Sequence, residues 1–284
     1  MSSWLVTGAG GMLGQDLLAV LKDTSASVTA LARADLDITD PAAVGAAVAD
    51  HDVVVNAAAW TDVDGAETAE AAATAVNGVG VGHLADACAT AGARLLHVST
   101  DYVFAGDGTT PYAEDAPTAP INAYGRSKLV GERAVLTLAP DLGYVVRTAW
   151  LYGSGGRNFV TTMLRLAAER DTLDVVDDQR GQPTWSRALA QQLVALGGAA
   201  LAGTAPAGVY HGTASGETTW YGLAREVFAQ RGLDPDRVRP TTSAAYVRPA
   251  PRPAYSVLGH ARWAAAGLPP LPDWRTSLAT FLST

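Results

Sequence analysis

The first half of the chain alternates short apolar runs with longer segments whose apolar residues recur at helical spacing. The runs are rich in β-branched residues, as is typical of strands buried in a parallel sheet. We predict strands at 3–7, 28–32, 52–56, 94–99 and 143–148, a further short strand before Asp37, and helices starting near Thr39, spanning 69–90 and running through Tyr124 to about Leu138. This β-α repeat predicts an α/β fold with a Rossmann-type, doubly wound, mostly parallel sheet.

The pattern changes after Trp150, where turn-rich and proline-rich stretches separate the elements. We predict helices within 149–170, at 188–203, at 217–230 with Ser215 or Thr218 as its cap, and one ending near Phe281, together with a strand at 208–212 that returns to the main sheet. Two domains follow. Residues 1–150 and 185–214 are assigned to an NAD(P)-binding Rossmann domain, and 151–184 and 215–284 to a smaller C-terminal domain for the substrate.

A glycine turn follows the first predicted strand. Gly8, Gly11 and Gly14 are spaced G-x-x-G-x-x-G between that strand and a helix. Glycines here permit a tight bend, a close approach of the backbone to a pyrophosphate, and close packing of helix on strand. The phosphates would lie at the helix N-terminus, where free N–H groups and the helix dipole meet them. The turn therefore predicts a dinucleotide cofactor.

The residues after the second predicted strand bear on the choice of cofactor. In NAD-selective sites an acidic residue commonly ends this strand and holds the adenosine ribose. Here Ala32 is followed by Arg33, which can accommodate a 2′-phosphate. We therefore favour NADPH, with NADH still possible, and an exposed loop arginine without cofactor contact is the other interpretation of Arg33.

Two later stretches are placed to line the same cofactor. Asp37 and Ile38 would meet the adenine ring. The small side chains of Ala57, Ala58 and Ala59 would let the cofactor pass over the end of a strand without collision.

The stretch from His97 to Lys128 contains the side chains best suited to chemistry. Tyr124 and Lys128 lie one turn apart on one face of a predicted helix. A phenol is a poor proton donor or base near neutral pH until a nearby cation favours the phenolate. Lys128 can supply that cation, and Thr100 at a strand end can add a hydrogen bond. The chain has only two lysines against eighteen arginines, which favours a functional pair over a chance one on a solvated helix face.

All these features fall at one edge of the predicted sheet. The glycine turn, residues 56–59, Thr100 and the helix carrying Tyr124 all follow carboxyl ends of parallel strands. Dinucleotide sites in such sheets lie outside those ends. Independent features thus agree on one location.

Composition narrows the class of protein. The 284 residues are 48% hydrophobic and 17% charged, as in ordinary globular domains. We see neither a signal peptide nor an 18-residue apolar span, so we expect no membrane partner and a cytoplasmic location. The single cysteine, Cys88, excludes an internal disulfide and fits a reducing compartment. The five histidines lack metal-ligand spacing, and we predict no metal site.

Charge is distributed unevenly along the chain. The net charge of −8 argues against nucleic acid as a partner. Residues 1–150 hold 7 Lys and Arg against 18 Asp and Glu, whereas 151–284 hold 13 Arg against 10 Asp and Glu. An anionic small molecule would find more cations in the second part. There Arg252 could meet phosphates and Trp150 could stack on a substrate ring, with core packing or solvation as the alternative for each.

Taken together, the motifs resemble those of the dTDP-4-dehydrorhamnose reductases, which belong to the extended short-chain dehydrogenase/reductases. The resemblance rests on TGAGGMLG, LDITD, VVNAAAWTDVD, HVSTDYVF, NAYGRSKLVGE, VVRTAWLYG, VDDQRGQPT, GVYHGTASGETTWYGLAREVF and RPAYSVL. It runs almost end to end and in order, so it is far more specific than any single motif.

This resemblance implies an NAD(P)H-dependent reduction of the C4 ketone of dTDP-4-dehydro-β-L-rhamnose to dTDP-β-L-rhamnose. Tyr124 would give its proton to the C4 oxygen, Lys128 would lower the Tyr124 pKa and hold the nicotinamide ribose, and Thr100 would polarise the carbonyl. Cofactor contacts would come from Gly8, Gly11, Met12, Leu13, Arg33, Asp37, Ile38, Ala57, Ala58, Ala59, Trp60, Thr61, Tyr124 and Lys128. Contacts to the dTDP-sugar would come from Thr100, Asp101, Tyr102, Trp150, Asn158 and Arg252.

The chain departs from the family pattern in three places. No acidic residue ends the second strand, which puts the use of NADH in doubt. RPAYSVL has Tyr255 and Val257 where relatives often have Asn and Arg. Some relatives dimerise through a Mg²⁺ held by surface carboxylates, and Asp16 is the one candidate for such a site, so a homodimer stays open without a metal.

Two other functions stay open. A 4-ketoreductase of another dTDP-deoxysugar pathway would share the fold and the chemistry. A non-catalytic regulatory subunit, like those of methionine adenosyltransferase, has a similar sequence. The complete set of Thr100, Tyr124 and Lys128 argues against the second alternative, since a binding module has no need of all three.

Overall fold

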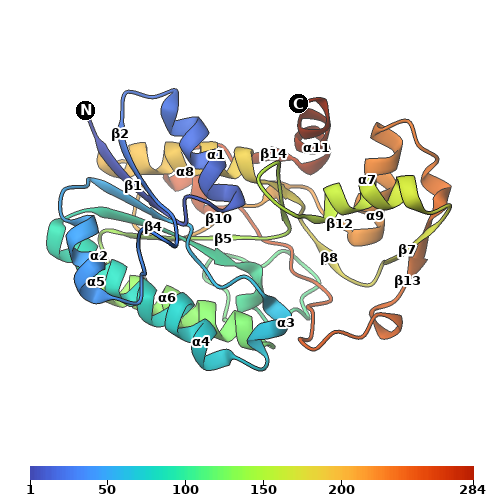
Figure 1. Ribbon diagram of the computed structural model, residues 1–284, viewed down its shortest axis with the longest axis horizontal. Helices are drawn as coiled ribbons and strands as arrows, with labels where there is room; N and C mark the ends of the chain where they lie inside the picture. The colour runs from blue at the N-terminus through green and yellow to red at the C-terminus, as the bar shows by residue number, and fades with distance from the viewer.

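The computed structural model describes every residue from 1 to 284. A parallel sheet of six strands lies at its centre, in the order β2-β1-β3-β4-β5-β10 (Figure 1). Its strands are β1 Ser3–Thr7, β2 Ser27–Leu31, β3 Val53–Asn56, β4 Arg94–Thr100, β5 Gly143–Thr148 and β10 Gly208–His211. The doubly wound parallel sheet is confirmed, and so is the return of the 208–212 segment to it.

One predicted strand is wrong. Residues 32–40 form turns instead of a strand before Asp37. The carboxylate of Asp35 accepts from the backbone N–H of Ala32, and that of Asp37 accepts from the backbone N–H of Thr39. Short acidic side chains that bond the nearby backbone in this way compete with strand pairing. The sheet therefore ends at β2.

Helices cover both faces of the sheet (Figure 1). On one face α1 Met12–Lys22 packs against α8 Ser186–Leu201, and on the other lie α2 Pro41–Val48, α5 Val81–Ala91 and α6 Ala123–Leu138. Each strand supplies both faces, because successive side chains point to opposite sides. On β1, for example, Trp4 and Val6 join the core beneath α1 and α8, whereas Leu5 joins the core beneath α2 and α5.

The long helix predicted over 69–90 forms, with a π-helical turn inside it. Its parts are α4 Glu70–Thr74, the π-turn η1 Ala75–Gly80 and α5. The turn lies against α6, where a side chain at Gly131 would collide with the carbonyl oxygen of Asn77. Such π-turns are often found at functional sites. This one places the buried Asn77 beside the carboxyl edge of the sheet.

The remaining elements form a second lobe and the segments that join it to the sheet. They are α3 Val63–Ala66, η2 Asp101–Val103, β6 Leu151–Tyr152, α7 Phe159–Glu169, β7 Leu173–Val176, β8 Arg180–Gly181, β9 Thr184–Trp185, β11 Ala214–Ser215, β12 Thr218–Thr219, α9 Trp220–Gln230, η3 Pro235–Arg237, β13 Val238–Thr241, η4 Ser243–Ala245, α10 Arg262–Ala265, β14 Leu271–Asp273 and α11 Trp274–Ser283. Buried residues of α7, α9 and α11 form a separate hydrophobic core in this lobe. None of the helices combines the length and the hydropathy needed to span a lipid bilayer.

Two details of the second lobe differ from expectation. The cap of α9 is Thr219 instead of Ser215 or Thr218: the helix begins at Trp220, and the hydroxyl of Thr219 accepts from the N–H of Gly222. In addition, Trp263 of α10 belongs to the core beneath α1 and α8, and its indole N–H donates to the carbonyl of His211. Part of the region assigned to the substrate domain therefore packs on the sheet.

Candidate active site

The glycine turn between β1 and α1 is shaped to receive a phosphate group. Gly8 has a φ of +68°, and a Cβ there would lie 2.6 Å from the backbone of Ala57 and Ala58. Gly11 caps α1 without a side-chain hydrogen bond, so the first N–H groups of the helix stay free to bind an anion. Met12 begins the helix, whereas the side chain of Leu13 is buried in the core and leaves only its backbone for a ligand.

The predicted adenosine contacts lie in the turns after β2. Arg33 is exposed there, next to the carboxylate of Asp37. Hydrogen bonds from the backbone N–H and hydroxyl of Thr39 lower the pKa of Asp37. The side chain of Ile38 is buried in the core beneath α2 and α5, against Gly80. Arg33 is thus free to meet a ligand, whereas Ile38 offers mainly its backbone.

The segment after β3 crosses the carboxyl edge of the sheet. Ala57, Ala58 and Ala59 are half-buried, and Thr61 is exposed. The backbone N–H of Trp60 donates to Asn77 Oδ1 over 2.8 Å, and Asn77 Nδ2 donates back to the carbonyl of Trp60 over 3.1 Å. The π-turn in the helix therefore holds this segment in place. The sequence showed Asn77 only as one residue of a helix and offered no sign of this role.

Two of the three predicted catalytic residues, Thr100 and Tyr124, meet at this edge. Thr100 ends β4, and its hydroxyl is hydrogen-bonded to the phenol of Tyr124 on α6. Lys128 follows one turn later on α6 and is buried. Tyr102 packs with its ring edge against Tyr124, with 6.0 Å between the ring centroids. Gly125 allows this approach, because a side chain there would collide with the carbonyl oxygen of Tyr102.

The electrostatics of Tyr124 differ from the sequence-based expectation. Burial raises the pKa of Tyr124, the nearby Asp101 raises it further, and the hydrogen bond with Thr100 lowers it. Lys128 does not lower the pKa of Tyr124 in this arrangement, because its ammonium points elsewhere. Its Nζ donates to the carbonyl of Val98 over 2.7 Å and lies 3.5 Å from His97 Nε2. Burial also lowers the pKa of Lys128, to about 8.

Asp101 is a buried carboxylate directly beside the catalytic set. Its Oδ1 accepts from the hydroxyl of Thr100 over 3.0 Å, and it is 3% exposed. Burial raises the pKa of Asp101 to about 6, although hydrogen bonds from Ser256 and Thr100 act in the opposite direction. A charge held here at neutral pH opposes ionisation of Tyr124 and so helps to keep its proton in place.

This burial makes a prediction for stability. Because the folded-state pKa of Asp101, about 6, lies above the ordinary value of 3.8, its stabilising contribution is present below pH 3.8 and lost as pH rises through 6. Asp101→Asn is therefore expected to stabilise the fold at pH 8, by up to about 3 kcal/mol, and to add nothing at pH 3. Urea unfolding at both pH values measures this, with the exposed Asp86→Asn as control. An equal effect at both pH values would contradict the assignment.

Trp150 has the one left-handed non-glycine backbone in the chain, with a φ of +48°. Its indole stacks on that of Trp220, with 3.6 Å between ring centroids and 10° between planes. Gly181 lies against Trp150, where a Cβ would be 2.7 Å from the indole. A non-glycine residue held in this conformation costs energy that the surrounding structure must offset. The stack therefore orients the predicted sugar contact, and Trp220 was not anticipated from the sequence.

Asn158 has a structural role at the start of α7. Its Oδ1 accepts from the N–H of Thr161 and caps the helix, and its Nδ2 donates to the carbonyls of Gly153 and Gly156. All polar atoms of the side chain are therefore engaged. Contact with the substrate through Asn158 stays a prediction.

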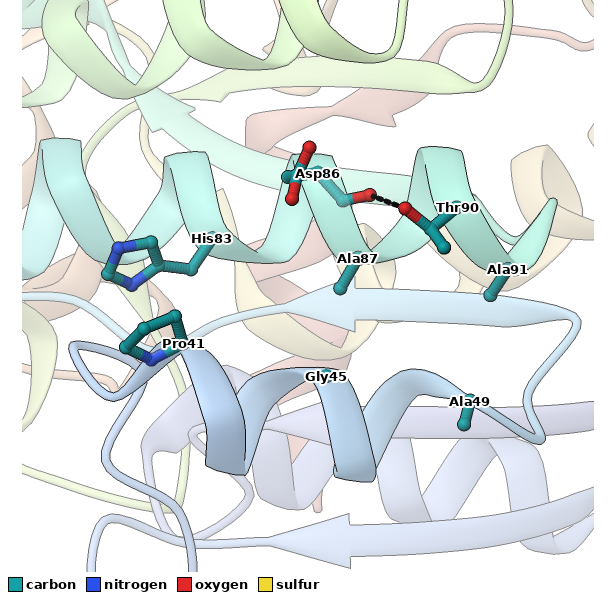
Figure 2. A pocket seen from close by; sticks show the side chains of 8 residues that line it. All are labelled: Pro41, Gly45, Ala49, His83, Asp86, Ala87, Thr90 and Ala91. Atoms are coloured by element: carbon teal, nitrogen blue, oxygen red, sulfur yellow. Dashed lines mark hydrogen bonds between the residues drawn. The ribbon is translucent and has the colours of Figure 1, made fainter.

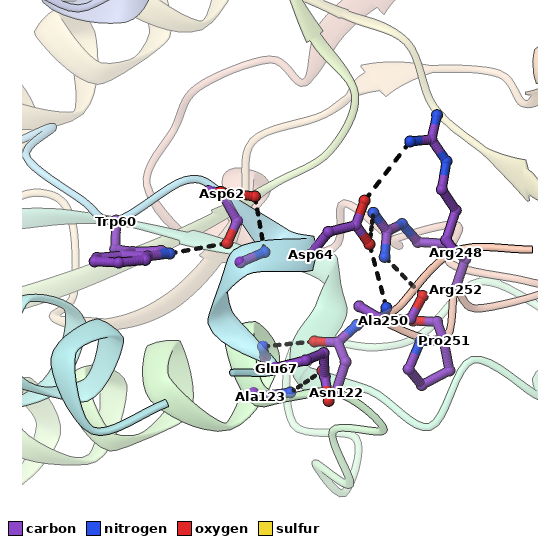
Figure 3. Close-up of polar contacts among 12 residues, drawn as sticks. Trp60, Asp62, Asp64, Glu67, Asn122, Ala123, Arg248, Ala250, Pro251 and Arg252 are labelled. Atoms are coloured by element: carbon purple, nitrogen blue, oxygen red, sulfur yellow. Dashed lines mark hydrogen bonds and ion pairs between the residues drawn. The ribbon is translucent and has the colours of Figure 1, made fainter. Parts of the chain in front are cut away.

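Arg252 lies in a charged cluster at the start of α3 (Figure 3). Asp64 forms ion pairs with Arg252 at 3.1 Å and with the exposed Arg248 at 3.8 Å. Nearby, the carboxylate of Glu67 accepts from the N–H of Ala123, the first residue of α6. The cluster joins α3, α6 and the 248–252 segment. Phosphate binding by Arg252 would compete with Asp64, a partner that sequence alone did not reveal.

Other parts of the surface lack the features of this site. A groove of about 330 Å³ lies between α2 and α5, with Pro41 and His83 at one end and alanines along its length (Figure 2). It contains none of the predicted cofactor, substrate or catalytic residues. No group of three or more His, Cys, Asp or Glu side chains is arranged to hold a metal ion. Asp16 accepts a hydrogen bond from the hydroxyl of Ser186.

Comparison with known proteins agrees with the geometry. A family model described as RmlD substrate binding domain matches residues 2–284. A Streptomyces griseus protein named dTDP-4-dehydrorhamnose reductase is 62% identical over 277 residues, covering 97% of this chain and 91% of that protein. A Streptomyces niveus protein named dTDP-4-keto-6-deoxy-D-glucose reductase is 54% identical over 277 residues, covering 97% and 94%.

Solved structures give the same answer. The crystal structure of dTDP-4-dehydrorhamnose reductase from Bacillus anthracis in complex with NADP superposes with a TM-score of 0.93. It is 34% identical and covers 99% of each chain. The chain therefore belongs to the RmlD substrate binding domain family, that of the dTDP-4-dehydrorhamnose reductases.

Proposed function

We propose that this protein reduces the C4 ketone of dTDP-4-dehydro-β-L-rhamnose to dTDP-β-L-rhamnose with NADPH. The observation that carries the proposal is the contact between Thr100 and Tyr124 at the carboxyl edge of the sheet, with Lys128 buried one turn further along α6. The Streptomyces griseus relative carries the matching name over nearly the whole chain. A regulatory binding subunit would not require these three side chains.

The glycine turn and the segment after β3 suit a dinucleotide. Gly8 and Gly11 leave room and free N–H groups for its pyrophosphate, and Ala57–Ala59 leave room above β3. Bound NADPH supplies a hydride to the ketone carbon. The Bacillus anthracis relative was solved with NADP, which supports the same cofactor here.

Residues of the chain supply the proton that the C4 oxygen receives. The phenol of Tyr124 donates its proton to the developing C4 oxyanion, and its raised pKa keeps that proton bound until charge develops. Thr100 orients the phenol through their hydrogen bond. Lys128 lies one turn further along α6 and returns a proton to the phenolate that remains after transfer. We assign the sugar nucleotide to the second lobe, next to Trp150.

Arg33→Ala tests the choice of cofactor. If the guanidinium binds the 2′-phosphate, its loss is expected to raise the Michaelis constant for NADPH roughly tenfold or more, the scale of a charge-assisted hydrogen bond, and to change that for NADH little. Steady-state kinetics with both cofactors measures this. The exposed Arg231→Ala serves as a control for the loss of a positive charge. Equal effects of Arg33→Ala on both cofactors would exclude a role in 2′-phosphate binding.

A second candidate is a 4-ketoreductase acting on a different dTDP-deoxysugar. The Streptomyces niveus relative, at 54% identity, favours it. A comparison of kcat/KM for dTDP-4-dehydro-β-L-rhamnose and dTDP-4-dehydro-6-deoxy-α-D-glucose separates the two functions. We expect the rhamnose precursor to be preferred, and preference for the glucose derivative would establish the alternative.

A further inference from the structure

Three polar side chains form a row beneath α6. Thr7, Asn56 and His97 are register partners on the adjacent strands β1, β3 and β4, and all three are buried. They point toward the face that α5 and α6 cover, because Leu5, Val54 and Leu95, two residues earlier on each strand, lie in the core of that face. Lys128 of α6 meets the row at His97, at 3.5 Å. The row therefore leads from the glycine turn to the catalytic lysine.

The hydrogen bonds fix the orientation of the Asn56 amide. Its Oδ1 accepts from the backbone N–H of Ala58 over 3.1 Å and from the hydroxyl of Thr7 over 2.7 Å. A backbone N–H can only donate, so the atom facing Ala58 must be the oxygen. The Asn56 NH₂ group is therefore the one that faces His97 Nδ1, at 3.1 Å.

This orientation determines the tautomer of His97. An NH₂ group can only donate, so His97 Nδ1 must accept and carries no proton. A neutral imidazole then has its proton on Nε2. Nε2 is the atom that faces Lys128 Nζ. An N–H directed at Nζ repels an ammonium and can donate to the lone pair of a neutral amine.

We propose that His97 is a positioning residue for Lys128: held by Asn56 with its proton on Nε2, it favours the neutral amine and eases proton release from Lys128 toward Tyr124. The catalytic part of this inference rests on the proposed function. The tautomer of His97 is inferred from the hydrogen bonds alone and does not rest on the proposed function. The segment at Ala58, which would line the cofactor, is bonded to the same Asn56 and so is coupled to the lysine.

The other groups around Lys128 do not replace this effect. Glu132, one turn further on α6, favours the ammonium, but its carboxylate is engaged by the buried Arg147 at 2.7 Å. Tyr124 lies one turn before Lys128 on the same helix. Burial, with the charge of Lys128, holds the pKa of His97 well below its usual range, and burial lowers the pKa of Lys128 to about 8. A neutral His97 and a readily deprotonated Lys128 are consistent with the geometry.

The tautomer can be measured directly on the full chain. Nitrogen-15 NMR of protein labelled in histidine distinguishes protonated from unprotonated ring nitrogens, and His97→Gln identifies the signal among the five histidines. We expect His97 to show an unprotonated Nδ1 and a protonated Nε2 at pH 7. A proton on Nδ1, alone or together with one on Nε2, would overturn the proposal. This measurement needs neither substrate nor turnover, so its outcome is separate from that of the proposed function.

Two variants test the action on Lys128. Asn56→Asp keeps an oxygen that accepts from Ala58 but turns a second oxygen, also an acceptor, toward His97. The imidazole proton then moves to Nδ1, and Nε2 presents a lone pair to Lys128. We expect the Lys128 titration to move up by about one pH unit or more. In His97→Gln the amide oxygen accepts from Asn56 and the amide NH₂ group faces Lys128, as the two ring nitrogens of His97 do. The pKa of Lys128 should therefore stay unchanged in this variant.

Lysine NMR provides the readout, since the chain has only two lysines and Lys22 is exposed. In Asn56→Asp, the apparent pKa of the high-pH limb of the pH–rate profile should rise together with the pKa of Lys128. In His97→Gln, both values should stay unchanged. Equal shifts in both variants, or a reversed tautomer with an unmoved Lys128 titration, would overturn the proposal. A moved titration in a protein that lacks ketoreductase activity would support the coupling and count against the function alone.

Discussion

Tyr124→Phe is expected to bind NADPH nearly as well as the unaltered protein and to turn over roughly a hundredfold more slowly or worse, the usual scale for losing a positioned acid. The phenol contacts Thr100 at the carboxyl edge of the sheet, and the ring that remains in the variant still packs against Tyr102. Steady-state kcat and the cofactor dissociation constant, from nicotinamide fluorescence, measure the two effects separately.

Tyr144→Phe is the matched control. Tyr144 is a buried phenol on β5 that donates to the carbonyl of Ala205, away from the catalytic edge, and its loss should leave kcat unchanged. Unchanged turnover in Tyr124→Phe would show that another group supplies the proton. A parallel loss of cofactor affinity would mean that the variant disturbs the site as a whole.

Arg147→Met is expected to destabilise the fold by about 3–5 kcal/mol, because it leaves the carboxylate of Glu132 buried without its partner. Arg147 and Glu132 are 4% and 1% exposed in their side chains and are joined through two guanidinium nitrogens. Arg147 also packs over the ring of Phe104, with 4.9 Å from its Cζ to the centroid. Urea unfolding monitored by tryptophan fluorescence gives the free energy of unfolding.

The double variant Arg147→Met with Glu132→Leu separates charge from packing. Replacing both partners by apolar residues of similar size is often neutral or stabilising, so the double variant should recover most of the loss. A double variant as unstable as the single one would show that packing against Phe104, rather than the unpaired carboxylate, accounts for the effect.

The main sheet was predictable because parallel strands buried on both faces carry continuous β-branched runs, as in DVVVN and GYVVRT. The short strand before Asp37 was wrong because its acidic side chains bond the adjacent backbone instead. The predicted cap of α9, Ser215 or Thr218, was wrong because α9 begins at Trp220, which makes Thr219 the residue whose hydroxyl reaches the free N–H of Gly222.

The candidate site was predictable in its residue types but not in its partners. The motif spacing places Thr100 at a strand end beside Tyr124 and Lys128 one helical turn after it, but it does not show that the ammonium of Lys128 points to Val98 and His97. The partners Asp64 of Arg252 and Trp220 of Trp150 lie far away in sequence and depend on how the second lobe folds back. The tautomer of His97 depends on strand register, which no local pattern encodes.

The central claim is that this protein catalyses hydride transfer from NADPH to C4 of a dTDP-4-keto sugar. The most direct measurement uses NADPH carrying deuterium at the transferable position of the nicotinamide, with dTDP-4-dehydro-β-L-rhamnose as substrate. We predict stoichiometric oxidation of NADPH and a dTDP-β-L-rhamnose product with deuterium at C4 only. Absence of NADPH oxidation, or deuterium at any other carbon, would contradict the account.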